Sequence, residues 1–584
     1  MIAKILTTLL GLTLVLAVAC GGAPAAPEPT ATQAAETAPA AEPTAAPAES
    51  EASQPTAVPQ VAEPPAEAEV NPGKLTIMIG GFGNERFDPT FTSSNSQDYT
   101  RQVHGFLISS DIKDGRRVVV PGIASEWGVS SDTLTWTLTI REGVKFHDGT
   151  EVTAEDALWS LQHIIGPEAV EWATTSATVV GRIIDRMEQT GPDEVSVTFK
   201  VPYAGFPTAI SEAGSSPHGF VIHKRATLHD EAEELAYDRN PIGAGLMRLV
   251  EHVPASQMTF ERFDDFYYQP ENGFPKDKRP NFQSLDLYLV PEESTRVAAL
   301  RSGEADIAPV TLATRQQVEA GGGRVVFGQE GVYLEIFQMG CFKPQFPCHD
   351  QRVRQALSYA IDRVLIRDRL YGGPEVLQVK GWGSVTPSSI GYSPELDPFP
   401  FDPDKARQLL AEAGYPGGQG FGKLVINTLV STSAPLLPES AQLGAEFWKR
   451  ELGLDAEVKV WDAAALSAAV SLTEDLYGQI YWRANQTELD ASRLLRKFYA
   501  DPDQKSRRHE DPDLRPLTEK ALDVFDSAER EMALNSTYRR MRDEAYDIPL
   551  GYFNIPWGVG PRVVAWDPWS LAFHISALHT VTLK

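Results

Sequence analysis

Residues 134–140 alternate between apolar and polar side chains, with the apolar ones at Leu134, Trp136, Leu138 and Ile140. This period of two predicts a half-buried β-strand. Asp148 and Gly149 then favour a turn. From Thr153 the apolar residues recur at helical spacing, and Asp156 stands three positions later, where it can complete a helix-capping pair. The segment therefore predicts a strand, a turn and a capped helix in succession.

The same two patterns recur along the chain. Alternation predicts strands at residues 75–79, 285–290, 425–429 and 456–460. Helical spacing with end signals predicts three helices, after Asp350 as far as Gly372, between Asp402 and Gly414, and over residues 440–452. Strands and helices mixed in this way indicate an α/β fold.

The length of the chain indicates how many domains it can form, and its net charge excludes one class of partner. The 584 residues, 42% hydrophobic and 22% charged, suffice for two or three ordinary domains. The net charge of −27 argues against nucleic acid as a partner, because phosphate binding requires clustered Lys and Arg.

The first residues resemble a bacterial lipoprotein signal. Lys4 precedes an apolar stretch, residues 5–19, that has the length of a secretion signal and is too short to span a bilayer. Small residues directly before Cys20 resemble a lipobox, which implies that residues 1–19 are removed and that Cys20 carries a lipid. An ordinary cleaved signal with an incidental cysteine is the alternative.

Residues 20–71 have the composition of a tether. Between residues 21 and 69 the chain is mostly Ala, Pro, Glu, Thr and Ser, with eight Glu and no Lys or Arg. Such a segment cannot bury enough apolar surface to offset the entropy lost on ordering. We expect it to be disordered and to join the lipid to the folded part.

Residues 121–160 resemble the signature of the family 5 extracellular solute-binding proteins, the peptide, dipeptide and nickel-chelate receptors that feed ABC importers. Further motifs follow in the family's order, at residues 87–89, 240–245, 296–307, 350–363 and 402–414. Because these motifs share one order over about residues 75–562, the chain is identified as a member of this family.

The resemblance implies a type II, Venus-flytrap fold like that of periplasmic binding proteins, with two lobes. Lobe I would comprise residues 72–330, with an extra subdomain at about 111–222. Lobe II would comprise residues 331–545. Residues 546–584 would return to lobe I, and Ile548 to Phe553 resemble the family's return strand.

The resemblance also locates the ligand. Tyr481, Trp482 and Asn485 match the place where peptide-binding members carry Trp-x-Ala/Gly-Asp, whose Asp holds the peptide's ammonium group. Asn485 supplies no charge, which weakens the case for free-amine peptides; alternatively, Glu488 or Asp490 fills that role. By position in the family we expect ligand contacts at Phe91, Thr92, Ser93, Tyr333, Phe337, Tyr481, Trp482 and Asn485.

Cys341 and Cys348 are the only cysteines besides Cys20. In an exported protein, two cysteines this close predict a local disulfide, because a metal site would need two more ligands beside them.

The sequence offers no convincing catalytic constellation. His147 and Asp148 fall at the predicted strand-to-helix turn, and the glycine run 418–422 follows a helix instead of a strand. The acidic pairs at residues 501–503 and 511–513 lack the glycine and glutamate of a calcium loop, so we interpret both as solvated loops. We expect the protein to have no enzymatic activity, no metal site and no cofactor.

These observations predict a monomeric, lipid-anchored receptor on the outer face of the cytoplasmic membrane. It would capture a small organic solute between its lobes and deliver it to an ABC permease. Oligopeptides rank first by family, oligosaccharides second because of Asn485 and the aromatic residues near it, and metal chelates third. A surface sensor or adhesin and a surface hydrolase are the alternatives from other classes.

Overall fold

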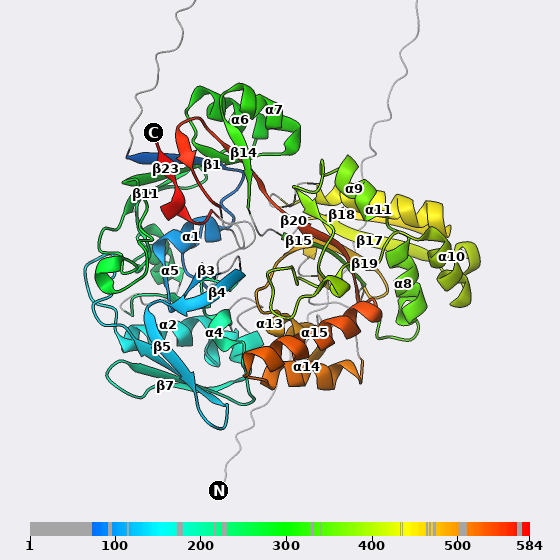
Figure 1. Cartoon of the computed structure of the whole chain (residues 1–584), viewed down its shortest axis with the longest axis horizontal. Helices are drawn as coiled ribbons and strands as arrows, with labels where there is room; N and C mark the ends of the chain where they lie inside the picture. The colour runs from blue at the N-terminus through cyan, green and yellow to red at the C-terminus, as the bar shows by residue number, and fades with distance from the viewer. Residues whose placement is uncertain are drawn as a thin grey trace, which may run out of the picture. The chain divides into compact units, whose positions relative to one another are not determined.

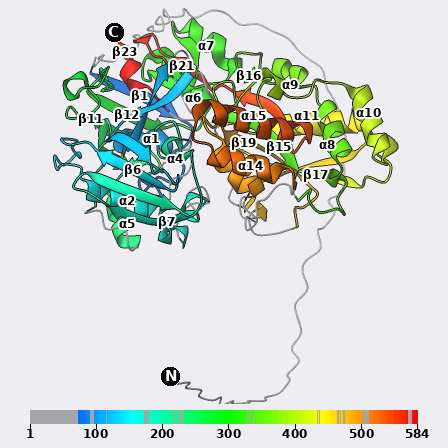
Figure 2. The ribbon, with the colours of Figure 1, turned by 60° about the horizontal axis from the view of Figure 1, so that its bottom comes forward.

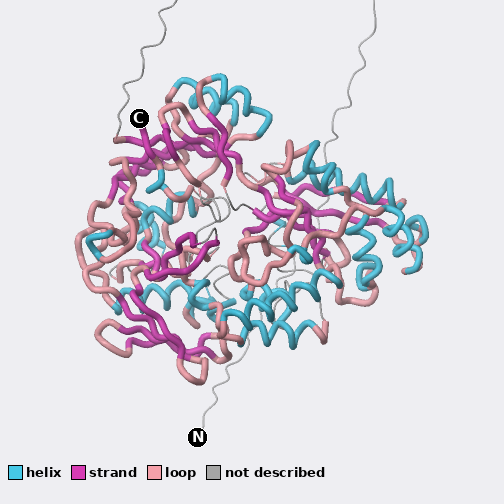
Figure 3. Tube along the Cα trace, viewed as in Figure 1, coloured by secondary structure: helices cyan, strands magenta, loops and turns pink. Residues whose placement is uncertain are grey.

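The computed structural model describes residues 73–584 except 91–95, 114–115, 172–178, 215–217, 225–230, 329–331, 339, 432–433, 435, 463–464, 467–468, 471–474, 501–510 and 569–574. The predicted signal, Cys20 and the tether lie outside the described residues. Those that are described belong to one unit, residues 67–584. Its strands gather in separate groups with helices around them (Figure 3).

The first large sheet has seven strands, in the order β10 (Met247–Val253), β11 (Gln257–Arg262), β12 (Ser284–Leu289), β1 (Lys74–Ile79), β13 (Ile307–Pro309), β21 (Pro556–Val559) and β14 (Arg324–Phe327). The predicted strands at residues 75–79 and 285–290 are β1 and β12. β1 runs parallel to both β12 and β13, so the carboxyl ends of all three meet at one edge. Helices α6 (Glu293–Ser302) and α7 (Arg315–Ala320) pack beside this edge.

The strand, turn and helix predicted around residue 140 are confirmed. β6 (Thr135–Ile140) belongs to an antiparallel sheet with β5 (Ala124–Val129), β8 (Glu194–Phe199) and β7 (Ile184–Gln189). α2 (Ala154–Ile165) begins with a complete capping box, because the Thr153 amide donates to Asp156 Oδ2 (2.9 Å) and the Asp156 amide to Thr153 Oγ1 (3.3 Å).

Shorter elements complete this half of the chain. They are α1 (Gln97–Val103), β2 (Gly105–Phe106), β3 (Ile108–Lys113), β4 (Arg116–Pro121), α4 (Phe206–Ala209), β9 (Phe220–Val221) and α5 (Glu231–Arg239). Near the end of the chain, β22 (Val563–Ala565) pairs with β23 (Thr582–Leu583), and Figure 1 shows β23 beside β1 and β11.

The second large sheet has six strands, in the order β16 (Leu377–Gln378), β20 (Asp547–Phe553), β15 (Val332–Gln338), β19 (Ile480–Gln486), β17 (Lys423–Leu429) and β18 (Asp455–Trp461). The strands predicted at residues 425–429 and 456–460 are β17 and β18. Its helices are α8 (Gln351–Tyr359), α9 (Arg363–Arg369), α10 (Pro403–Glu412), α11 (Leu437–Leu452), α13 (Ser492–Leu495), α14 (Leu514–Asp523) and α15 (Ser527–Asp543). Figure 2 shows α14 and α15 side by side in front of β15 and β19.

The prediction of a single helix after Asp350 is wrong. α8 ends at Tyr359, and α9 starts anew because the Asp362 carboxylate caps it, accepting from the Leu365 amide (2.9 Å). Arg363 fixes the break by donating to the carbonyl oxygens of Pro549 (2.6 Å) and Phe399 (3.0 Å). The helix predicted between Asp402 and Gly414 is confirmed as α10, with the Asp402 side chain as its cap.

The prediction that residues 546–584 return to the first lobe as a whole is also wrong. β20, which contains Ile548 to Phe553, pairs with β15 and β16 in the second sheet. Only β21 pairs with β13 and β14 of the first sheet. The chain therefore crosses between Phe553 and Pro556. Both strands are almost wholly buried, so their apolar pattern cannot tell one sheet from the other.

Candidate functional site

A cavity of about 900 Å³ lies where the strands of both sheets end. From the first sheet its walls include Ile79, which ends β1, and Pro309, which ends β13. From the second they include Val430, which follows β17, and Phe553, which ends β20. In open α/β sheets, ligands bind outside the carboxyl ends of the strands, so this is the candidate binding site.

Most of the lining is apolar. It comprises aliphatic and aromatic side chains, among them Ile79, Leu312, Leu370, Tyr371, Val376, Phe553, Ile555 and Trp557. Such walls can bury the body of an organic molecule, while a few polar groups set its orientation.

Arg296 is the most buried of the arginines that line the cavity, with 8% of its surface exposed. Its Nη1 donates to the carbonyl oxygens of Val290 (2.8 Å) and Pro291 (2.7 Å), and its Nε to that of Pro309 (3.1 Å). These bonds tie the chain after β12 to the end of β13. Burial lowers the pKa of the guanidinium, because no nearby charge fully replaces the lost water.

An ion pair joins the two lobes at the cavity. Arg315 on α7 donates to Glu375 Oε2 (2.9 Å), just before β16, and to Glu319 Oε1 (3.0 Å) on its own helix. The bond to Glu375 raises the pKa of Arg315. Glu375 belongs to the second lobe and α7 to the first, so this pair can form only when the lobes are close.

Among the described residues, the two carboxylates that line the cavity both have protein partners. Glu293 accepts from the Thr311 amide (2.7 Å), Thr311 Oγ1 (2.9 Å) and Thr314 Oγ1 (2.6 Å). Asp98 accepts from the Ile575 amide (2.8 Å), and burial raises its pKa to about 7. Neither group is therefore a strong, free anchor for a cation.

The expected ligand contact at Trp482 is wrong. The indole has no exposed surface, its Nε1 donates to Ser440 Oγ (2.9 Å), and its ring packs edge-on against Trp448 at 6.1 Å. A Cβ on Gly444 of α11 would lie 2.2 Å from this ring, so the glycine makes room for it. Trp482 is part of the core between β19 and α11.

Tyr481 and Asn485 lie on the other face of β19, since alternate residues of a strand face opposite ways. Tyr481 is 9% exposed and packs with Leu466 and Leu476. The Asn485 side chain is half-buried and donates to Ser384 Oγ (3.2 Å). Neither residue lines the 900 Å³ cavity.

The alternative anchors for an ammonium group already have cationic partners. Glu488 accepts from Arg493 (2.5 Å), and Asp490 accepts from Arg530 (2.7 Å). Both carboxylates are buried, with 7% and 6% of the residue exposed. Neither can take a ligand's ammonium without giving up its arginine.

Five other expected contacts cannot be placed as side chains. Phe91, Thr92 and Ser93 lie outside the described residues. For Tyr333 and Phe337 only the backbone is described; it pairs with Asn485 and Tyr481, respectively. Arg296, Arg315 and Tyr371 lie at the cavity although the sequence did not single them out; Arg296 does begin one of the matched motifs.

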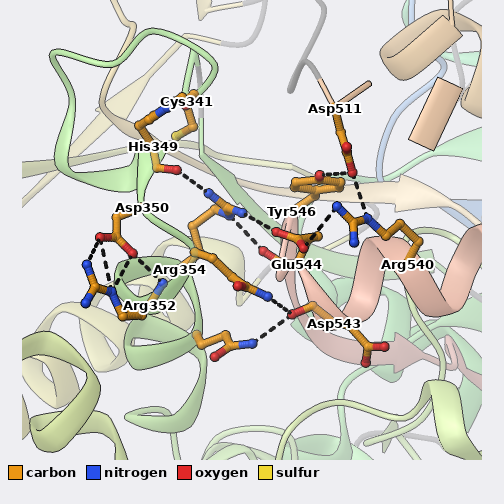
Figure 4. Close-up of polar contacts among 12 residues, drawn as sticks. Cys341, His349, Asp350, Arg352, Arg354, Asp511, Arg540, Asp543, Glu544 and Tyr546 are labelled. Carbon is orange, nitrogen blue, oxygen red and sulfur yellow. Dashed lines mark hydrogen bonds and ion pairs between the residues drawn. The ribbon is translucent and has the colours of Figure 1, made fainter. Parts of the chain in front are cut away.

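Cys341 and Cys348 form a disulfide, with Cα atoms 5.3 Å apart, as predicted. Arg354 holds this loop against the end of α15 (Figure 4). Its Nη1 donates to the carbonyls of Cys348 (3.1 Å) and His349 (2.8 Å), and its Nε to that of Glu544 (2.8 Å).

The interpretation of residues 511–513 as a solvated loop is wrong for Asp511. Its carboxylate accepts from Arg540 Nε (2.8 Å) and from the Tyr546 hydroxyl (2.5 Å), and its side chain is only 5% exposed (Figure 4). The pair at residues 501–503 lies outside the described residues. His147 does sit in the turn before α2, where its Nε2 lies 3.0 Å from the Gly245 carbonyl oxygen.

Within the described part of the chain, no three His, Cys, Asp or Glu side chains are grouped to hold a metal ion. None of the helices described there is long and apolar enough to cross a membrane.

Comparisons with known proteins agree with this architecture. The model of the bacterial extracellular solute-binding proteins, family 5, matches residues 118–506. The glutathione-binding protein GsiB of Pectobacterium atrosepticum is 28% identical over 65% of this chain and 69% of its own. For its Escherichia coli K12 counterpart, the match spans 62% of that protein, less than two thirds.

Two solved structures share the fold. The chain resembles DppA of Helicobacter pylori, solved with the peptide STSA, with a TM-score of 0.70 and 20% identity over 88% of this chain and 98% of that one. It resembles NikZ of Campylobacter jejuni, solved with Ni(L-His), with a TM-score of 0.70 and 18% identity over 88% and 100%.

Proposed function

Because the chain belongs to the family 5 bacterial extracellular solute-binding proteins, we propose that it is the receptor of an ABC importer. It captures a small organic solute between its two lobes and hands it to a permease in the membrane. It acts by binding and carries out no chemical turnover. The supporting observation is the 900 Å³ cavity at the carboxyl ends of both sheets, lined by both lobes.

Closure of the lobes follows from this geometry. A solute that contacts Leu312 on one side and Tyr371 on the other has more contacts in the closed state than in the open state. Its binding energy therefore shifts the equilibrium towards closure. The Arg315–Glu375 ion pair also stabilises the closed state.

Oligopeptides are the first class of solute that we propose. The relative GsiB is named for glutathione, a tripeptide, and DppA was solved with a peptide, which supports this choice. NikZ was solved with a metal chelate, so the family's ligands differ. The oligosaccharide alternative loses support, because it rested partly on Trp482, which is wholly buried.

The lipid anchor on Cys20 and a position on the outer face of the cytoplasmic membrane are part of the same proposal. They rest on the lipobox-like residues before Cys20 and on the tether composition of residues 20–71. An anchored receptor stays close to its permease, which raises the effective concentration of one for the other.

A bulky residue at the cavity tests the proposal. Val430 lines the cavity and is 68% exposed, so Val430→Trp should fill space without disturbing the core. We expect solutes that raise the melting temperature of the native protein to bind this variant at least about tenfold more weakly. Val460→Trp is the matched control, since Val460 is 51% exposed on β18 and lies outside the cavity.

The panel should contain peptides, glutathione, oligosaccharides and metal chelates. If no solute shifts the melting temperature of the native protein, the proposed function is wrong. If solutes bind both variants equally well, the site lies elsewhere in the molecule.

A further inference from the structure

Two guanidinium groups at the cavity have no carboxylate partner. Arg296 lies in α6 of the first lobe and Arg369 at the end of α9 in the second, and both line the cavity. No carboxylate among the described residues lies within ion-pair distance of either. The cavity therefore presents, from each lobe, one guanidinium that forms no ion pair with a described carboxylate, although Glu293 acts on Arg296 and Asp368 on Arg369 from a greater distance.

Arg296 is held rigidly for this role. Its three hydrogen bonds go to neutral carbonyl oxygens, which orient the guanidinium without neutralising it. Glu293 and Glu292 are near enough to raise the pKa of Arg296, but burial lowers it more, so the buried guanidinium stays unfavourable. An anion that entered the cavity would relieve this penalty and gain charge-assisted hydrogen bonds.

Arg369 completes the arrangement from the other lobe. Its neighbour on the same helix, Arg367, is bound to Asp368 (2.7 Å), whereas Arg369 is not. Arg369 is exposed and belongs to the cavity lining, beside Leu370 and Tyr371. It is thus available to a solute that binds between the lobes.

The acids at the cavity offset these charges only in part, because burial lowers the pKa of Arg296 by more than Glu293 raises it. Glu293 accepts three hydrogen bonds from threonines 311 and 314. Asp98 accepts from a backbone amide, and its burial favours the neutral form.

On the basis of the proposed function, we propose that this receptor selects solutes that carry a carboxylate, which binds between Arg296 and Arg369 while an apolar body packs on Tyr371 and Phe553. The carboxylate contacts both lobes at once. It therefore holds them closed, and the charge of the solute decides which molecules trigger closure.

Matched pairs of solutes test this inference. Glutathione and a set of N-acetylated dipeptides are each prepared as the free acid and as the carboxamide, and their dissociation constants are measured by calorimetry on the native protein. We expect the acid of each pair to bind about 10- to 100-fold more tightly, as the loss of a charged hydrogen bond predicts. This preference should weaken as salt is added.

Arg369→Gln should remove most of the preference for the acid, and Arg367→Gln on the same helix should retain it. Arg369 is chosen for substitution because replacing Arg296 could loosen the ends of β12 and β13. Equal binding of acid and carboxamide, or a preference that survives Arg369→Gln, would overturn the inference.

The inference and the proposed function fail in different ways. If only uncharged or cationic solutes bind, and Val430→Trp weakens them, the choice of carboxylates is wrong and the receptor function stands. If no solute of any class binds the native protein, both are wrong.

Discussion

At the scale of single residues, burial decides which candidates can contact a solute. Trp482 occupies a position that matches a ligand-binding motif, yet its indole is fully buried and bonded to Ser440. Arg296 was not singled out, yet it lines the cavity. A sequence motif gives the position of a residue along the chain, whereas the side of the strand that it occupies depends on pairing with distant segments.

Trp482→Phe tests the core role directly. The change removes the indole bond to Ser440 and leaves a small void, so we expect the free energy of unfolding to fall by about 2 kcal/mol. Solute affinity should be unchanged at temperatures where the variant is folded. Chemical denaturation and calorimetry measure the two quantities; Trp127→Phe, at a half-buried indole on β5, is the control. A large loss of affinity with intact stability would place Trp482 in the site.

The raised pKa of Asp98 predicts how the stability of the fold depends on pH. Burial raises the pKa of its carboxyl from 3.8 to about 7 in the folded state. The folded protein therefore holds this proton more tightly than the unfolded chain, and stability falls as pH rises from about 4 to about 7. The loss is up to about 4 kcal/mol above pH 7.

Asp98→Asn keeps the acceptor for the Ile575 amide but removes the titration. We expect the variant to exceed the native protein in stability at pH 8 and to match it near pH 4, as measured by denaturation at both pH values. The same pH dependence in both proteins would show that Asp98 does not have the raised pKa.

At the scale of elements, local patterns predicted most of the framework. The alternation of β6, the capping box of α2 and the end signals of α10 depend on residues close in sequence, so they could be recognised without a structure. The break between α8 and α9 could not, because Arg363 fixes it through carbonyls of Pro549 and Phe399. The sheet to which β20 belongs likewise depends on long-range pairing.

The disulfide loop gives a prediction at this scale. Closing the short loop from Cys341 to Cys348 should stabilise the fold by roughly 2.5 kcal/mol through loop entropy. The double substitution Cys341→Ser and Cys348→Ser should lower the free energy of unfolding by about this amount, with solute affinity retained, because Arg354 still holds the Cys348 and His349 carbonyls.

A reducing agent provides the control for this prediction. It should destabilise the native protein and leave the double variant unaffected in denaturation experiments. If the double variant lost solute binding but not stability, the loop would have a role in the site instead.

At the scale of the whole molecule, the chain passes between the two sheets where β14 is followed by β15 and where β20 is followed by β21. The chain leaves the first sheet after β14 and returns between Phe553 and Pro556. The cavity lies beside this return, so contacts there can couple a solute to the motion of both lobes. The family resemblance predicted two lobes, but the lining of the cavity combines residues from 79 to 557 that no local pattern brings together.

Hydrogen–deuterium exchange with and without a bound solute tests the central claim most directly. With the solute that gives the largest thermal shift, we expect slower exchange in both lobes, around Leu312 beside α7 and around Tyr371 after α9. Slower exchange is expected because closure buries these amides against the solute and against the other lobe. Protection confined to one lobe, or absent from both segments, would contradict capture of the solute between the lobes.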